Sequence, residues 1–224
     1  MSVTRLKLDH ALFAARTGRG VRVAVVDSGI AEGHSHVGEV AVGVSLVHSV
    51  GDTLDRIGHG TAVAAAIREK APVAILVPVK VFDRALTTDA RTLAEAIHWA
   101  ADHECQIVNL SLGTANAEHA ALLQAAVSYA AMRGTRVVSA YESDAVRWLP
   151  GSLAGAIGVV GRDDIAREEL VAELAGPFDL SPVGASIYPR PIPGVPRERN
   201  LSGISFAVAN VSGFLARWLE VPTS

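Results

Sequence analysis

Short apolar runs alternate along the chain with longer segments in which apolar residues recur every third or fourth position. The runs cover residues 21–26, 73–81, 107–112, 136–140 and 156–161. Because each run is continuously apolar, it is typical of a strand that is covered on both faces, as in a parallel sheet. Patterns typical of helices are found at residues 61–70, 88–103, 117–133 and 205–220.

The regular alternation of strands and helices predicts an α/β fold with three layers, in which a mainly parallel, doubly wound sheet lies between two layers of helices. The segment 162–199 departs from this pattern, because it is rich in proline and predicts loops and short edge strands. No repeat or linker divides the sequence, so we expect residues 1–224 to form a single domain.

Composition limits the classes of function. Half of the 224 residues are apolar and 19% are charged, which allows a large core and excludes intrinsic disorder. The net charge of −3 argues against a nucleic-acid partner. The first twenty residues lack the pattern of a signal peptide, no apolar stretch is long enough to span a bilayer, and Cys105 is the single cysteine. We therefore expect a cytoplasmic protein that does not bind membranes.

Asp27 emerges from the first long apolar run, in VAVVDSGI. In open α/β sheets, sites form at the carboxyl ends of the strands. Asp27 has three interpretations at this point: an Asx-turn with Ser28 and Gly29, a phosphoacceptor or metal ligand, or a carboxylate that orients a histidine. A phosphoacceptor would need a nearby lysine and a second acid that the sequence does not identify.

His59 and Ser205 each begin a predicted helix. His59 lies between Gly58 and Gly60 in GHGTAVAAAI, where the lack of side chains allows a close approach, or where Thr61 simply caps the helix. Ser205 lies in LSGISFAVANVSG, where free backbone N–H groups favour an oxygen that gains negative charge, or where the serine is itself an N-cap.

Together, Asp27, His59 and Ser205 form the set that acyl transfer to a serine requires. Serine is a weak nucleophile until a base takes its proton, and the histidine needs a carboxylate to hold its tautomer. No histidine follows His119, so the order serine, acid, histidine of α/β-hydrolases is excluded. The order aspartate, histidine, serine on an α/β sheet is that of subtilisin.

The sequence resembles the subtilisin-like serine proteases from about Leu8 to Trp218, as a compact and divergent member. The segments that carry the resemblance are VRVAVVDSGI, HGTAVAAAI, VPVKVFD, AEAIHWAADH, IVNLSLG, SPVGASI and GISFAVANVSG. The resemblance implies that Asp27 orients His59, that His59 is the general base, and that Ser205 is the nucleophile of a serine endopeptidase. It also implies that Ser111, Leu112 and Gly113 pair with an extended substrate, which is a peptide or unfolded protein.

The sequence departs from the family where an asparagine side chain normally stabilises the oxyanion. The corresponding residues 139–144 contain no asparagine. Ser143 is a candidate donor, and Glu142 is one only if it is protonated. A peptidase without this donor has two interpretations: a dedicated peptide-processing protease, or an inactive pseudoprotease that binds peptides or acts as a scaffold. Transfer of the acyl group to an amine is a further variant with the same residues.

Other features of the family also differ. The loop that commonly binds calcium is deleted after the helix of His59, so we expect no metal and no cofactor. Because the resemblance begins at about Leu8, we expect no prodomain. Ala62 replaces a second histidine of the family, and Phe206 follows the serine. We interpret Cys105 as a structural thiol, and the His34–Ser35–His36 segment as a polar loop.

Overall fold

The computed structural model describes residues 3–48, 50–173, 182–191, 196 and 199–221. Within these residues, ten strands form one sheet in the order β1-β9-β10-β8-β6-β5-β2-β4-β3, and β7 pairs with β6. The strands are β1 Val3–Lys7, β2 Arg22–Asp27, β3 Val44–Ser45, β4 Ile75–Lys80, β5 Ile107–Leu110, β6 Arg136–Ser143, β7 Val146–Arg147, β8 Ile157–Arg162, β9 Glu169–Glu173 and β10 Val183–Ser186.

The part of the sheet from β10 to β3 is parallel, whereas β1 and β9 extend it by antiparallel pairing. β2 lies between β4 and β5, with Asp27 opposite Lys80. Because the central strands run in the same direction, their carboxyl ends lie along one edge of the sheet. This edge is where the sequence places its candidate residues.

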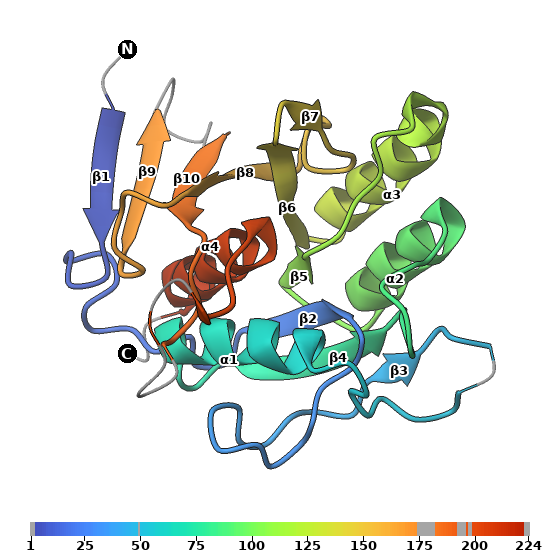
Figure 1. The fold of residues 1–224 in the computed structure, drawn as a ribbon, viewed down its shortest axis with the longest axis horizontal. Helices are drawn as coiled ribbons and strands as arrows, with labels where there is room; N and C mark the ends of the chain where they lie inside the picture. The colour runs from blue at the N-terminus through green and yellow to red at the C-terminus, as the bar shows by residue number, and fades with distance from the viewer. Residues whose placement is uncertain (1–2, 49, 174–181, 192–195, 197–198, 222–224) are drawn as a thin grey trace.

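Helices cover both faces of the sheet. They are α1 His59–Lys70, α2 Ala90–Asp102, α3 Ala120–Met132, which follows the short 3₁₀ turn η1 Ala117–His119, and α4 Ile204–Leu219. α1 and α4 pack together on one face, and α2 and α3 pack together on the other (Figure 1). Two separate apolar cores lie between the sheet and these layers. The predicted three-layer α/β fold is therefore confirmed.

The main error of the sequence prediction concerns the proline-rich segment. The part of 162–199 that the structure describes contains β9 and β10, and β10 is not an edge strand, because it lies between β8 and β9 and all its residues are buried. Residues 174–181, 192–195 and 197–198 of this segment lie outside the described residues. A four-residue strand flanked by proline gives too short an apolar run to be distinguished from a loop.

Two further elements differ from the prediction. β6 continues past Ala140 to Ser143 and turns back into β7, so residues 141–147 form a hairpin. β5 ends at Leu110, so Ser111 and Leu112 lie after the strand. The apolar run is longer than the strand because Leu112, which follows the strand, is apolar and half-buried.

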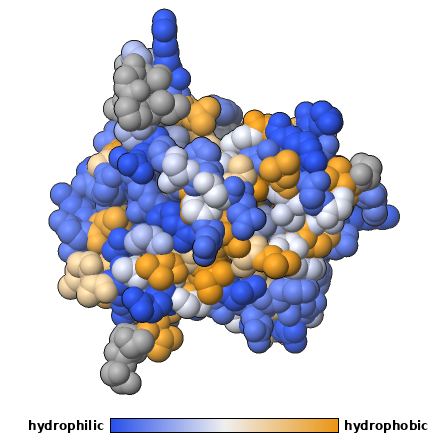
Figure 2. Space-filling view, turned by 90° about the horizontal axis from the view of Figure 1, so that it is seen from below, coloured by the Kyte–Doolittle hydropathy of each residue, from blue (hydrophilic) through white to orange (hydrophobic). Residues whose placement is uncertain are grey.

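The surface mixes polar and apolar side chains. Seen from below in Figure 2, apolar residues form separate patches between polar ones. Among the described residues, no helix combines the length and the apolar character that crossing a membrane requires.

The start of α1 lies unusually close to the end of β2. A Cβ atom added to Gly60 would lie 2.2 Å from the Gly29 carbonyl oxygen and 3.1 Å from the Asp27 Cβ. The sequence left open whether the glycines beside His59 allow a close approach or only lead into a helix capped by Thr61. For Gly60, the close approach is the correct interpretation. The missing side chain lets the helix bring His59 to the carboxyl end of β2.

We expect Gly60→Ala to lower the free energy of unfolding by about 1–3 kcal/mol, because the backbone must separate to admit the methyl group. Helix propensity acts in the opposite direction, since alanine is about 1 kcal/mol better than glycine inside a helix. Urea unfolding measures the difference. Gly51→Ala is the control, since its Cβ would meet nothing within 4 Å; an equal loss in both variants would contradict the close-approach argument.

Candidate active site

Asp27 is a fully buried carboxylate at the carboxyl end of β2. The backbone N–H of Ser28 donates to its Oδ1 at 2.8 Å, so the local turn predicted from the sequence is present. A buried carboxylate needs further partners, because it has lost its hydration. The turn alone does not satisfy it.

His59 supplies the main partner. It is the first residue of α1, and its Nδ1 lies 2.8 Å from Oδ1 and 2.9 Å from Oδ2 of Asp27. An ionised carboxylate can only accept, so the contact places the proton on Nδ1 and leaves Nε2 as an acceptor. The side chain of His59 is 24% exposed, so the imidazole remains accessible to a reactant.

The residue that fixes the start of α1 is Asp55, which the sequence analysis missed. Its Oδ2 accepts from the backbone N–H of Thr61 at 2.8 Å and from the Thr61 hydroxyl at 2.6 Å. Its Oδ1 accepts from the backbone N–H groups of Ile57 at 2.9 Å and Gly58 at 2.8 Å. The expectation that Thr61 caps the helix is wrong: Gly58 is the N-cap residue, and Asp55 satisfies the free N–H groups.

Ser28 joins this capping group to β2. Its hydroxyl lies 2.8 Å from Asp55 Oδ1 and accepts from the backbone N–H of Gly60 at 3.0 Å. Asp55 and Ser28 therefore link the strand that carries Asp27 to the helix that carries His59. An acid four residues before His59, directly ahead of a helix, is the signal that could have identified Asp55.

The surroundings of His59 favour its protonated form. Burial alone would lower the pKa of His59, but the hydrogen bond and charge of Asp27, together with the charge of Asp55, outweigh burial and raise the pKa above its ordinary value of 6.5. Burial acts in the opposite sense on Asp55, whose pKa is nevertheless lowered by hydrogen bonds from Thr61, Gly58 and Ile57. Asp55 therefore remains ionised beside the imidazole.

Ser205 is the second residue of α4, two residues after Gly203, which has a positive φ of 147°. It is not the N-cap, because that position is held by Gly203 and no side chain caps the helix. Its Oγ donates to the backbone carbonyl of Ser111 at 3.1 Å. The nucleophile candidate is therefore held against the segment that follows β5.

A buried polar chain continues from this contact. Ser111 Oγ donates to the Ser205 carbonyl at 3.2 Å and accepts from Asn109 Nδ2 at 2.9 Å, while Ser212 donates to Asn109 Oδ1 at 2.9 Å. Asn109 and Ser212 are fully buried. This chain fixes α4 to β5, and the sequence analysis did not identify either residue.

His59 and Ser205 lie on neighbouring elements without a hydrogen bond between them within the described residues. The ring of Phe206, the residue after Ser205, lies 6.2 Å from the His59 ring, centroid to centroid. Asp27 and His59 are thus in direct contact, whereas the Ser205 hydroxyl is directed to Ser111.

Comparison with known proteins identifies the family. The model of the Subtilase family matches residues 18–164, which is more than half of the chain. The chain belongs to the subtilase family.

Known proteases are similar in sequence to this subtilase over most of its length. It is 29% identical to M-protease of Shouchella clausii (strain KSM-K16) and to Subtilisin Savinase of Lederbergia lenta, each over 96% of its length. It spans 58% of M-protease and 81% of Subtilisin Savinase.

Two solved structures have the same fold. A cold adapted subtilisin-like serine proteinase matches with a TM-score of 0.71 and 22% identity, over 92% of this chain and 77% of the other. A lanthipeptide protease matches with a TM-score of 0.66 and 19% identity, over 91% and 74%.

Two residues of the predicted substrate segment, Leu112 and Gly113, line a cavity of about 860 Å³ in this subtilase. Phe82, Leu93 and His119 also line it. Among these residues, Phe82 and Leu93 are buried. The predicted substrate-binding segment therefore faces a space that can hold side chains.

The two oxyanion candidates lie in the β6–β7 hairpin. The indole N–H of Trp148 donates to Ser143 Oγ at 2.9 Å. Glu142 is 44% exposed and lies 3.7 Å from Arg147. Neither candidate contacts Ser205 within the described residues.

The remaining candidates behave as structural groups. His34 and His36 contact each other edge to face with centroids 5.5 Å apart, and no group of three or more potential metal-binding side chains occurs in the described part of the chain. Cys105 is buried, and burial raises the pKa of its thiol even though Arg22 acts in the opposite sense. The expectation of no metal and no cofactor stays a prediction.

We expect the His59 imidazole to titrate above 6.5 in an NMR titration of its ring proton. In Asp27→Asn, the charge is removed but an acceptor for Nδ1 remains, so burial should dominate and the pKa should fall by about one unit or more. Because the folded pKa is raised, the contribution of His59 to the free energy of unfolding is complete below 6.5 and is lost as the pH rises through the raised value. An unchanged titration in Asp27→Asn would contradict this assignment.

Proposed function

We propose that this subtilase is a serine endopeptidase with Asp27, His59 and Ser205 as its triad. The observation that carries the proposal is the 2.8 Å contact between His59 Nδ1 and the buried Asp27 carboxylate, near the first turn of α4, which carries Ser205. This contact leaves Nε2 free to take a proton, which is the role that a general base needs. Membership of the subtilase family supports the same reaction.

The proposed reaction proceeds in two halves. The Ser205 hydroxyl turns from the Ser111 carbonyl toward His59, which takes its proton as Oγ attacks the peptide carbonyl carbon. His59 then gives the proton to the leaving amine, and the C–N bond breaks to give an acyl-enzyme on Ser205. Water repeats the sequence: His59 takes its proton, the hydroxide attacks the ester, and Ser205 leaves with the proton. An amine in place of water gives transpeptidation.

The proposed substrate is an extended peptide or unfolded segment that pairs with Ser111, Leu112 and Gly113. All three residues follow β5, and Leu112 and Gly113 line the 860 Å³ cavity, so backbone pairing there would place a substrate side chain in the cavity. The narrower form of this proposal is a dedicated peptide-processing protease.

We propose Ser143 rather than Glu142 as the oxyanion donor. Trp148 donates to the Ser143 oxygen, so the hydroxyl proton stays available to a negatively charged acceptor. An ionised Glu142 beside Arg147 can only accept, and its charge would repel an oxyanion. Reciprocal backbone hydrogen bonds between Thr114 and Leu149, at 2.9 and 3.0 Å, hold this hairpin beside the segment of Gly113.

Two observations favour a second function, that of a pseudoprotease that binds peptides. Ser205 Oγ is engaged by the Ser111 carbonyl instead of His59, and residues 139–144 supply no asparagine. In that case the substrate segment would bind peptides without cleaving them.

A fluorophosphonate probe distinguishes the two functions. We expect covalent labelling of the full chain at Ser205, because only a serine activated by a base attacks phosphorus readily. Labelling should be lost in Ser205→Ala and in His59→Ala, and intact mass spectrometry measures it. Ser128→Ala, an exposed helix serine, is the matched control and should label like the unmodified chain.

Peptide cleavage completes this test. Hydrolysis of a peptide library that disappears in Ser205→Ala supports the peptidase. Binding of the same peptides without labelling or cleavage would show the pseudoprotease instead.

Removing the Ser143 hydroxyl tests the oxyanion donor. We expect Ser143→Ala to lower kcat about 10²- to 10³-fold with little change in KM, the size of effect that loss of one such donor has in subtilisin itself. Glu142→Gln serves as the comparison and should leave kcat unchanged or raise it, because it removes a repelling charge. A larger loss in Glu142→Gln than in Ser143→Ala would reverse the assignment.

A further inference from the structure

A fully buried lysine lies beside the catalytic pair and has no part in the proposed reaction. Lys80 ends β4, and it is the parallel neighbour of Asp27 in the sheet. Burying an ammonium group is costly unless each of its protons finds an acceptor. Its surroundings therefore indicate what it does.

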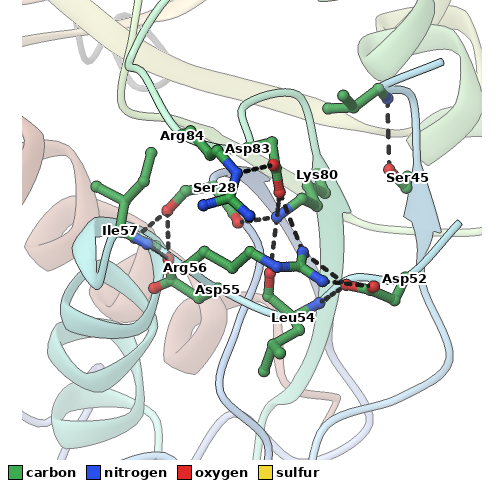
Figure 3. Close-up of polar contacts among 12 residues, drawn as sticks. Ser28, Ser45, Asp52, Leu54, Asp55, Arg56, Ile57, Lys80, Asp83 and Arg84 are labelled. Carbon is green, nitrogen blue, oxygen red and sulfur yellow. Dashed lines mark hydrogen bonds and ion pairs between the residues drawn. The ribbon is translucent and has the colours of Figure 1, made fainter. Parts of the chain in front are cut away.

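The Lys80 ammonium has three acceptors, one for each of its protons (Figure 3). Nζ donates to the carbonyl of Ser28 at 2.9 Å and to the carbonyl of Leu54 at 2.7 Å, and it lies 3.2 Å from Asp83 Oδ1. Two of the acceptors belong to the backbone of other segments. The third neutralises the charge.

The two carbonyl groups belong to the segments that carry the candidate site. Ser28 directly follows Asp27, and Leu54 directly precedes Asp55, which caps the helix of His59. One ammonium group thus fastens the end of β2 to the loop that leads into α1. Neutral side chains have at most two N–H donors on one nitrogen, so they cannot make all three contacts.

An outer ring of charges holds Lys80 and the loop in place. Asp83 also lies 3.0 Å from Arg56 NH1, and Arg56 binds both carboxylate oxygens of Asp52 at 3.0 and 2.8 Å. Figure 3 shows these side chains grouped around the Lys80 ammonium. The loop from Asp52 to Arg56 is therefore tied to the end of β4.

We propose that Lys80 is a positioning residue for the Asp27–His59 pair, which it aligns by holding the Ser28 and Leu54 carbonyls on a single ammonium group. Its contribution to kinetics rests on the proposed peptidase function. The effect of Lys80 on the geometry of His59 is independent of that function, because Lys80 joins two segments of the folded chain.

If Lys80 acted only through its charge, replacing it would change the pKa of His59 in the opposite direction from a loss of alignment. A nearby positive charge disfavours protonated histidine, so its removal would raise the pKa of His59. Loss of alignment weakens the contact with Asp27, so it would lower that pKa. The carboxylates that face His59 are those of Asp27 and Asp55, and both remain in the variants below.

Lys80→Met tests the proposal, with Lys70→Met as the matched control. Lys70 is the other fully buried lysine; it lies at the last turn of α1, paired with Glu69 at 2.6 Å. The readout is the NMR titration of the His59 ring proton, assigned among the eight histidines with His59→Gln. Circular dichroism establishes that each variant is folded.

We expect Lys80→Met to lower the pKa of His59 by about half a unit or more and Lys70→Met to leave it unchanged. If the chain cleaves peptides, kcat should fall about 10-fold or more in Lys80→Met with KM little changed, because a misaligned base affects the reaction more than binding. An unchanged or raised pKa in Lys80→Met, or an equal fall in Lys70→Met, would overturn the proposal.

Lys80→Gln carries the test if Lys80→Met does not fold. Its amide keeps two donors for the two carbonyls but no charge, so the proposal predicts a His59 pKa like that of the unmodified chain. A raised pKa would show an effect of charge and overturn the proposal. Because the titration needs no catalysis, an inactive chain with the expected titration would refute the peptidase function and leave the role of Lys80 standing.

Discussion

The buried contact between Asp27 and His59 is the constraint on which the arrangement of the site depends. A carboxylate without access to water at the end of a central strand is tolerated only when its oxygens are satisfied. Gly60 allows α1 to approach the end of β2 closely. Asp55 accepts from the free N–H groups at the start of α1, because the N-cap residue Gly58 has no side chain to do so. The parallel sheet supplies the common edge at which these segments meet.

The nucleophile candidate belongs to a second, separately built unit. Ser205 and Ser111 exchange hydrogen bonds, and Asn109 and Ser212 anchor this pair inside the core. In buried networks of this kind every member must be satisfied, which gives a single stable placement of the helix start. The two units meet where His59 and Ser205 lie, and the proposed reaction would require the Ser205 hydroxyl to exchange the Ser111 carbonyl for His59 Nε2.

The sequence predicts the individual strands and helices of this protein better than it predicts the contacts between residues that are distant in sequence. Apolar runs indicate the central strands and helices because each pattern lies within a few consecutive residues. Asp27, His59 and Ser205 are found because chemistry and chain order restrict them together. Lys80 and Asn109 are polar residues inside apolar strands, and several of their hydrogen-bond partners, Ser28, Leu54 and Ser212, lie far away in sequence. Their roles follow only from which strands are neighbours, which no local pattern specifies.

The β6–β7 hairpin, which carries the proposed oxyanion donor Ser143, contains a strained turn. Asp144 and Ala145 have φ values of 52° and 60°, a conformation that costs a residue with a Cβ about 1–2 kcal/mol. Positive φ at two successive residues is what a tight two-residue hairpin requires, and glycine or asparagine normally provides it. The Trp148–Ser143 hydrogen bond and the Thr114–Leu149 pairing hold the hairpin in this form. Contacts on both strands thus keep the strained turn in one conformation, which is what the proposed donor role of Ser143 would require.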